Sequence, residues 1–136
     1  MQIETRPFAP TNGVHFGSEV ESLSYLDGNL VVILACSQDE EGIIHGLKVH
    51  FAQPSGFRLL DELDLARYWM SKSFARGSHV LEVKNGGWST EEDALQSFET
   101  QRREWLVVSG NACVSVFSSL EPEFMDISWK DGNSAP

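Results

Sequence analysis

Two segments carry the residues best suited to a binding site. The first holds three carboxylates within four positions, a set that could bind a divalent cation or perform acid–base chemistry. The second is a double glycine followed by tryptophan, which leaves bare backbone beside an indole and could line a ligand site. The candidate binding residues of these two segments are Asp61, Glu62, Asp64, Arg67, Trp69, Gly86, Gly87 and Trp88.

Both segments also have a structural interpretation, which we favour. Asp61 can cap a short helix over residues 62–70, because its carboxylate can accept free backbone N–H groups in the first turn. The glycines suit a tight turn, and Ser89-Thr90-Glu91-Glu92 matches a capping box. We therefore predict a second helix that begins at Ser89, with Glu92 reaching back to it.

The histidines and cysteines show no catalytic or metal-binding motif. His45 and His50 are five apart in a predicted strand, so they point to opposite faces and cannot share a metal ion. We favour His45 as a hydrogen-bonded core histidine. Cys36 and Cys113 lie in apolar runs, are expected to be reduced and buried, and have no visible base beside them. We expect no catalytic residue, metal or cofactor.

Composition indicates one domain over residues 1–136, with flexible ends at 1–13 and 131–136. The formal charge of −10 argues against nucleic acid as a partner, since phosphates would be repelled, and fits a basic protein partner or simple solubility. The first residues lack the apolar core of a signal peptide, and no apolar run approaches the ~20 residues of a membrane span. We expect a cytoplasmic protein without membrane contact.

The hydrophobic pattern is dominated by strands. Residues 30–36 are apolar on both faces, which is typical of a central strand, and residues 43–51 alternate. Two β-rich runs flank Gly110-Asn111 and predict a hairpin, and residues 124–129 could add an edge strand or dock a helix. We expect an α+β fold, a mainly antiparallel twisted sheet of about six or seven strands with two short helices. The same pattern would also fit a partly closed, barrel-like sheet.

Part of the chain resembles a group of small uncharacterised bacterial proteins. The resemblance covers about half the chain, residues 57–122, and rests on Leu60-Asp61-Glu62-Leu63-Asp64-Leu65, Tyr68-Trp69, Gly86-Gly87-Trp88, Glu104-Trp105-Leu106-Val107 and Cys113-Val114. It implies a bacterial source. The group has no established activity, so the resemblance brings no catalytic residues.

Two functions fit these observations. The first is a non-catalytic interaction protein, one version being an antidote that covers the site of a basic toxin enzyme with carboxylates. The alternative is a small-molecule-binding domain or enzyme with a cleft beside Gly86-Gly87-Trp88. A flat acidic patch with an exposed aromatic would favour the first, and a deep pocket with converging polar groups the second. The expected contact charges are Asp39, Glu40, Glu41, Glu62 and Asp64, with Trp69 or Trp88 as anchor.

Overall fold

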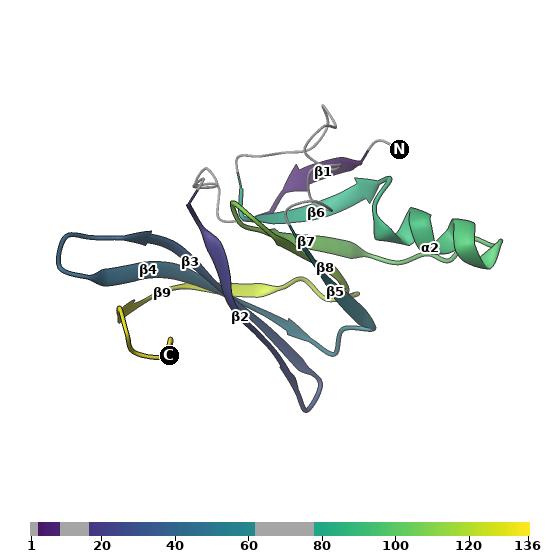
Figure 1. Ribbon diagram of the computed structural model, residues 1–136. Coiled ribbons are helices and arrows are strands. Elements are labelled where there is room, and N and C mark those ends of the chain that lie inside the picture. Colours follow the sequence, from purple (N-terminus) through teal and green to yellow (C-terminus); the bar gives the residue numbers. More distant parts are fainter. Residues whose placement is uncertain (1–2, 9–16, 62–77) are drawn as a thin grey trace.

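The computed structural model describes residues 3–8, 17–61 and 78–136, which form two antiparallel sheets and one helix (Figure 1). The five-stranded sheet has the order β1-β6-β7-β8-β5 and the four-stranded sheet the order β2-β3-β4-β9. The elements are β1 (Glu4–Pro7), β2 (Glu19–Leu26), β3 (Asn29–Gln38), β4 (Ile43–Ala52), β5 (Gly56–Leu60), β6 (Val80–Asn85), α2 (Trp88–Gln96), β7 (Glu104–Val108), β8 (Cys113–Phe117) and β9 (Glu123–Lys130).

The α+β character and the antiparallel pairing are confirmed, but the expected single sheet is wrong. The described strands number nine and divide between two sheets that are not closed as a barrel. The division follows β4, where Gln53 adopts a positive φ of 52° and β5 then pairs with β8 instead of β4. One of the two expected helices is present as α2, and the other, over residues 62–70, lies outside the described residues.

Short-range signals correctly predicted the hairpin at Gly110-Asn111. Ser109 and Ala112 close the two-residue loop between β7 and β8 with a 2.9 Å backbone hydrogen bond. Asp27 and Gly28 join β2 to β3 with φ values of 51° and 78°, as a two-residue turn of this hand requires. Residues 124–129 lie in β9, which pairs with β4 as the edge of the four-stranded sheet.

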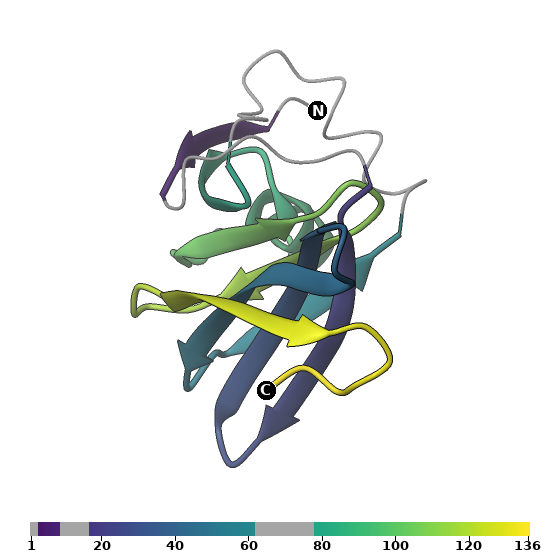
Figure 2. The same cartoon turned by 90° about the vertical axis from the view of Figure 1, so that its left-hand side faces the viewer.

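The main core lies between the two sheets. Figure 2 shows the four-stranded sheet turned toward the viewer with the other sheet beyond it. The buried side chains alternate along each strand, because successive residues point to opposite faces. The four-stranded sheet contributes Leu30, Val32, Leu34, Leu47, Val49 and Phe51, and the five-stranded sheet contributes Val80, Trp105, Val107, Val114 and Val116.

The five-stranded sheet is also buried on its other face. A second cluster gathers there from the alternate positions of the same strands, Leu81, Leu106, Val108 and Cys113, together with Ile3 and Leu60. Every residue of β7 and β8 is consequently buried. Within the described part of the chain, no helix has the length and apolar character needed to cross a membrane.

Candidate functional site

The Gly86-Gly87-Trp88 segment turns the chain from β6 into α2. Gly86 has a φ of +78°, a conformation that side chains disfavour. Gly87 has an ordinary φ of −94°, so its need for glycine is steric. A Cβ at this position would lie 2.9 Å from Val83 Cγ1 and would collide with Glu104 Oε2. The glycines therefore bring a buried carboxylate against the helix start.

Glu104 occupies the N-terminus of α2. Its two carboxylate oxygens accept hydrogen bonds from the backbone N–H groups of Trp88, at 2.9 Å, and Ser89, at 2.8 Å. The side chain is 2 % exposed, and this burial raises its pKa, while the two hydrogen bonds act in the opposite direction. The position that would attract an external anion is thus filled by the chain's own carboxylate.

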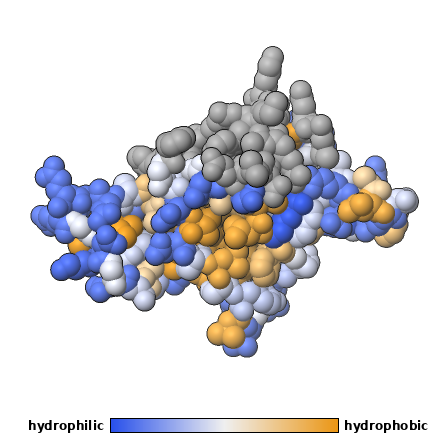
Figure 3. Space-filling view, in the orientation of Figure 1, coloured by the Kyte–Doolittle hydropathy of each residue, from blue (hydrophilic) through white to orange (hydrophobic). Residues whose placement is uncertain are grey.

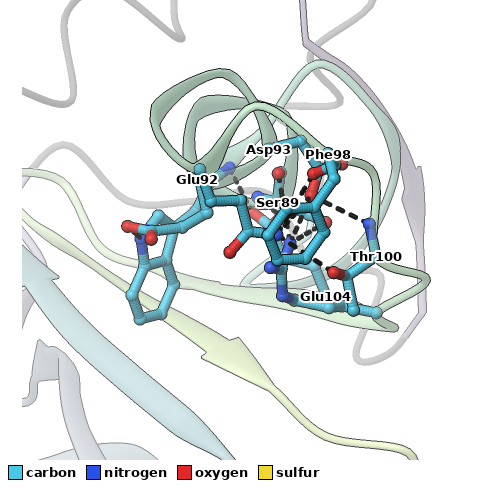
Figure 4. A network of polar contacts seen from close by, with 9 residues as sticks. Ser89, Glu92, Asp93, Phe98, Thr100 and Glu104 are labelled. Carbon is cyan, nitrogen blue, oxygen red and sulfur yellow. Dashed lines mark hydrogen bonds and ion pairs between the residues drawn. The ribbon is translucent and has the colours of Figure 1, made fainter.

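The predicted capping box is wrong. The helix begins at Trp88, its cap residue is Gly87, and no side chain of its own segment caps it. Glu92 instead accepts a hydrogen bond from the indole Nε1 of Trp88 at 3.0 Å. The cap was missed because Glu104 arrives from β7, where the sequence reads only as strand. Figure 4 shows Glu104 beside Ser89 at the helix start.

Trp88 packs α2 against the five-stranded sheet. Its ring stacks on Phe117 with centroids 4.0 Å apart, and the Arg58 guanidinium lies 4.9 Å from the indole centroid. Arg58 also pairs with Glu91 of the helix at 2.9 Å. The indole is half-buried and engaged inside the molecule, so it is poorly placed to anchor a partner.

A polar groove of about 540 Å³ runs beside the two glycines, bounded by β6 and the segment from Glu99 to Glu104. Its cations are already paired. Lys84 and Arg103 contact Glu82 at 3.1 and 2.7 Å, and Arg102 contacts Asp93 at 2.9 Å. Asp93 also accepts the backbone N–H of Thr100 at 3.1 Å (Figure 4). The groove offers hydrogen-bonding groups, but its charges are largely neutralised.

The structure brings only part of the predicted site together. Gly86 and Gly87 line the groove, and Trp88 faces Phe117. Asp61 is exposed at the end of β5, and the groove lining does not include it. The remaining predicted residues, Glu62, Asp64, Arg67 and Trp69, lie outside the described residues.

The predicted core histidine is wrong. His45 is exposed and pairs with Asp39 at 3.0 Å, a hydrogen bond that lowers the pKa of Asp39. Among the described histidines the buried one is His79, which is 3 % exposed and donates from Nδ1 to the Val108 carbonyl at 2.7 Å. The alternation placed His45 on the inner side of β4, but this end of the strand projects beyond the core.

His79 also corrects the expectation that neither cysteine has a neighbouring base. Its Nε2 lies 3.7 Å from Cys36 Sγ, at an irregularity of the β3–β4 register between Ala35 and Ser37. Burial raises the pKa of the Cys36 thiol, which keeps it neutral and a weak nucleophile. The contact joins Cys36 of β3 to His79, 43 positions away and just before β6, so sequence spacing gave no signal for it.

The two halves differ in how exposed their carboxylates are and in how many cations accompany them. The four-stranded half, residues 17–52 and 123–136, has two lysines, Lys48 and Lys130, against nine carboxylates. All nine are exposed: Glu19, Glu21, Asp27, Asp39, Glu40, Glu41, Glu123, Asp126 and Asp131. In Figure 3 hydrophilic residues cover the end where the β3–β4 turn projects. In the other half, all five described cations form ion pairs: Arg6, Arg58, Lys84, Arg102 and Arg103.

Exposed apolar residues stand at projecting tips. Figure 3 shows hydrophobic surface at the far end of α2 and at the β2–β3 tip, besides a central area. Tyr25 and Leu26, at the β2–β3 tip, are 51 % and 71 % exposed. An exposed aromatic thus lies on the acidic half.

Comparison with family models, curated proteins and solved structures finds no match for this chain. What the protein does must therefore be inferred from its own surface chemistry.

Proposed function

We propose that this protein is a non-catalytic interaction protein that binds a basic protein through its four-stranded half. The observation that carries the proposal is the exposure of nine carboxylates on a half with only two lysines. Such a surface attracts a basic partner over about one Debye length, about 8 Å at physiological salt. An antidote that neutralises a basic toxin enzyme in the bacterial cytoplasm would have this form.

The contact charges and the anchor would occupy the long β3–β4 and β2–β3 hairpins. Glu40 and Glu41 project at one end, and Tyr25 at the other, roughly 30 Å away for a strand of this length. This span fits a standard interface, which buries about 800 Å² on each partner. Tyr25 replaces Trp88 as the preferred anchor, because an exposed aromatic can be buried on binding whereas Trp88 is already stacked.

The test begins with affinity capture at low salt from a lysate of the source organism, followed by purification of the recovered basic protein. Binding kinetics are then measured with the Glu40→Gln/Glu41→Gln variant. We expect the association rate to fall about threefold to tenfold at low salt and the dissociation rate to change little. Tyr25→Ala should mainly raise the dissociation rate.

The matched control is Glu4→Gln/Glu99→Gln, which removes the same charge from exposed positions of the other half. It should slow association much less. If both double variants slowed association equally, only net charge would matter, and the proposed contact surface would be wrong.

The groove beside Gly86 and Gly87 supports a second candidate, a small-molecule-binding domain or enzyme. Its volume of about 540 Å³ is within the range of ligand sites, although its lining is polar. If capture recovers no basic protein while a ligand library raises the Tm, and Thr90→Trp in the groove abolishes that shift, this second function replaces the first.

A further inference from the structure

A separate hollow of about 440 Å³ lies on the outer face of the four-stranded sheet. We propose that it binds a small amphiphilic anion, namely a medium-chain aliphatic carboxylate. The hollow is formed where β3, β4 and β9 lie side by side, at the opposite end of the β3–β4 hairpin from the acidic turn. Its lining residues are Asn29, Val31, Lys48, His50, Glu123, Phe124 and Met125.

Strand register puts most of the lining on one face. Val31 pairs with His50, and Lys48 with Met125, so these four side chains share the side opposite the inter-sheet core. Val31 is half-buried, and Phe124 and Met125 are 41 % and 56 % exposed. Val31 and Met125 give the hollow an apolar floor open to solvent, which suits a short hydrocarbon chain. Phe124 pairs with the core residue Val49, so its side chain lies on the other side of the sheet, toward Phe8.

The polar residues of the hollow differ in whether they already have a partner. His50 Nε2 is 2.8 Å from Asn29 Oδ1, and its Nδ1 is 4.0 Å from Glu123 Oε2, so these three residues engage one another. Lys48 forms no ion pair with any residue that the structure describes. It is thus a cation with an unused charge beside apolar surface. A carboxylate head at Lys48 with its chain over Val31 and Met125 would satisfy both features.

The hollow lies on the same half as the proposed partner surface and shares Glu123 with it, but it would recognise a different ligand. Its floor is apolar and its free charge is positive, whereas the proposed partner surface is acidic. The volume of the hollow fits a small ligand, for which sites of roughly 300–1,000 Å³ are usual.

The probe is octanoate, followed through the methyl signals of protein labelled with ¹³C at the methionine methyl groups. The chain has three methionines, and Met125→Leu assigns the signal of Met125. We expect a saturable shift of the Met125 methyl on octanoate addition. Lys48→Gln should weaken binding at least about threefold, and neutral octanamide should bind the unaltered protein correspondingly more weakly.

Lys130→Gln is the matched control, because Lys130 is the other described lysine of this half and lies at the far end of β9. It should leave octanoate affinity unchanged, and both lysine variants should keep the Tm of the unaltered protein. Equal affinity of Lys48→Gln and the unaltered protein overturns the proposal. So does a Met125 signal that does not saturate.

Discussion

Among the described residues, only the five-stranded half buries carboxylates. In the five-stranded half, Glu82 is 4 % exposed and is surrounded by Arg6, Lys84 and Arg103, at 2.8, 3.1 and 2.7 Å. Glu104 is buried at a helix start. In the four-stranded half, all nine carboxylates face solvent.

This difference separates charge that holds the fold together from charge that is free for the proposed interaction. A buried carboxylate must be paired, because leaving it without partners costs several kcal/mol, so its position is fixed by folding. An exposed carboxylate costs little and stabilises little, so folding does not explain why all nine carboxylates of the four-stranded half stay exposed beside only two lysines. Substitutions in the two halves should therefore have very different effects on stability.

The largest effect is expected for Trp105→Ala. Trp105 is 0 % exposed, packs edge-on against Phe8 at 4.9 Å, and donates from Nε1 to the Ser118 carbonyl at 3.1 Å. Its truncation should lower the free energy of unfolding by about 4 kcal/mol. Trp129→Ala, on an edge strand over Gly46, should cost about 2 kcal/mol. Urea unfolding measures both, and equal losses would contradict the central role of β7.

The next largest loss of stability is expected for Glu82→Gln, and this loss depends on pH. Burial alone would raise the pKa of Glu82, but hydrogen bonds from Arg103 and Lys84 lower it to about 2 from an ordinary 4.5. A lowered folded pKa means that the carboxylate stabilises the fold above pH 4.5 and loses this effect as pH falls toward 2. The stabilisation is about 3 kcal/mol at neutral pH.

Urea unfolding between pH 7 and pH 2 gives the free energy of unfolding of Glu82→Gln and of the unaltered protein. The variant should be less stable at neutral pH, and the difference between the two should shrink below pH 4.5. Glu121→Gln, which removes an exposed partner of Arg103, should change stability little at any pH. If the difference in free energy of unfolding between Glu82→Gln and the unaltered protein stayed constant across this range, the carboxylate charge would not be what stabilises the cluster.

Gly87→Ala should lower the free energy of unfolding by an intermediate amount. The added Cβ meets Glu104 Oε2 and lies 2.9 Å from Val83 Cγ1, so the carboxylate must leave the helix start. We expect a loss of about 2 kcal/mol. Gly56→Ala is the control, since its Cβ would find ordinary contacts of 3.5 Å with Phe117 and Trp88, and it should change stability by less than about 0.5 kcal/mol. Comparable losses for the two variants would exclude the steric explanation.

The smallest effect on stability is expected for Glu40→Gln/Glu41→Gln. Both side chains are exposed in the β3–β4 turn, so thermal unfolding should give an unchanged Tm. Because the same variant should slow partner association, it separates the charge of this half that is free for the proposed interaction from the charge of the other half that holds the fold together. A clear fall in Tm would mean that these carboxylates also hold the fold.

Local patterns in the sequence were enough for several elements. Leu30 to Cys36 is apolar on both faces, and it forms part of the interior strand β3. Gly110-Asn111 lies between two β-rich runs and joins β7 to β8. These predictions hold because side-chain alternation and turn chemistry act over a few residues.

The sequence also determined the excess of negative charge, but it did not show where that charge would be free. The ion pairs of Glu82 reach Arg6 and Arg103, 76 and 21 positions away, and they exist only because β1 and β7 flank β6. The same is true of Glu104 at the start of α2 and of His79 beside Cys36. Side-chain periodicity fixes which face a residue occupies, but strand order decides what lies opposite it, and that order depends on contacts between distant segments.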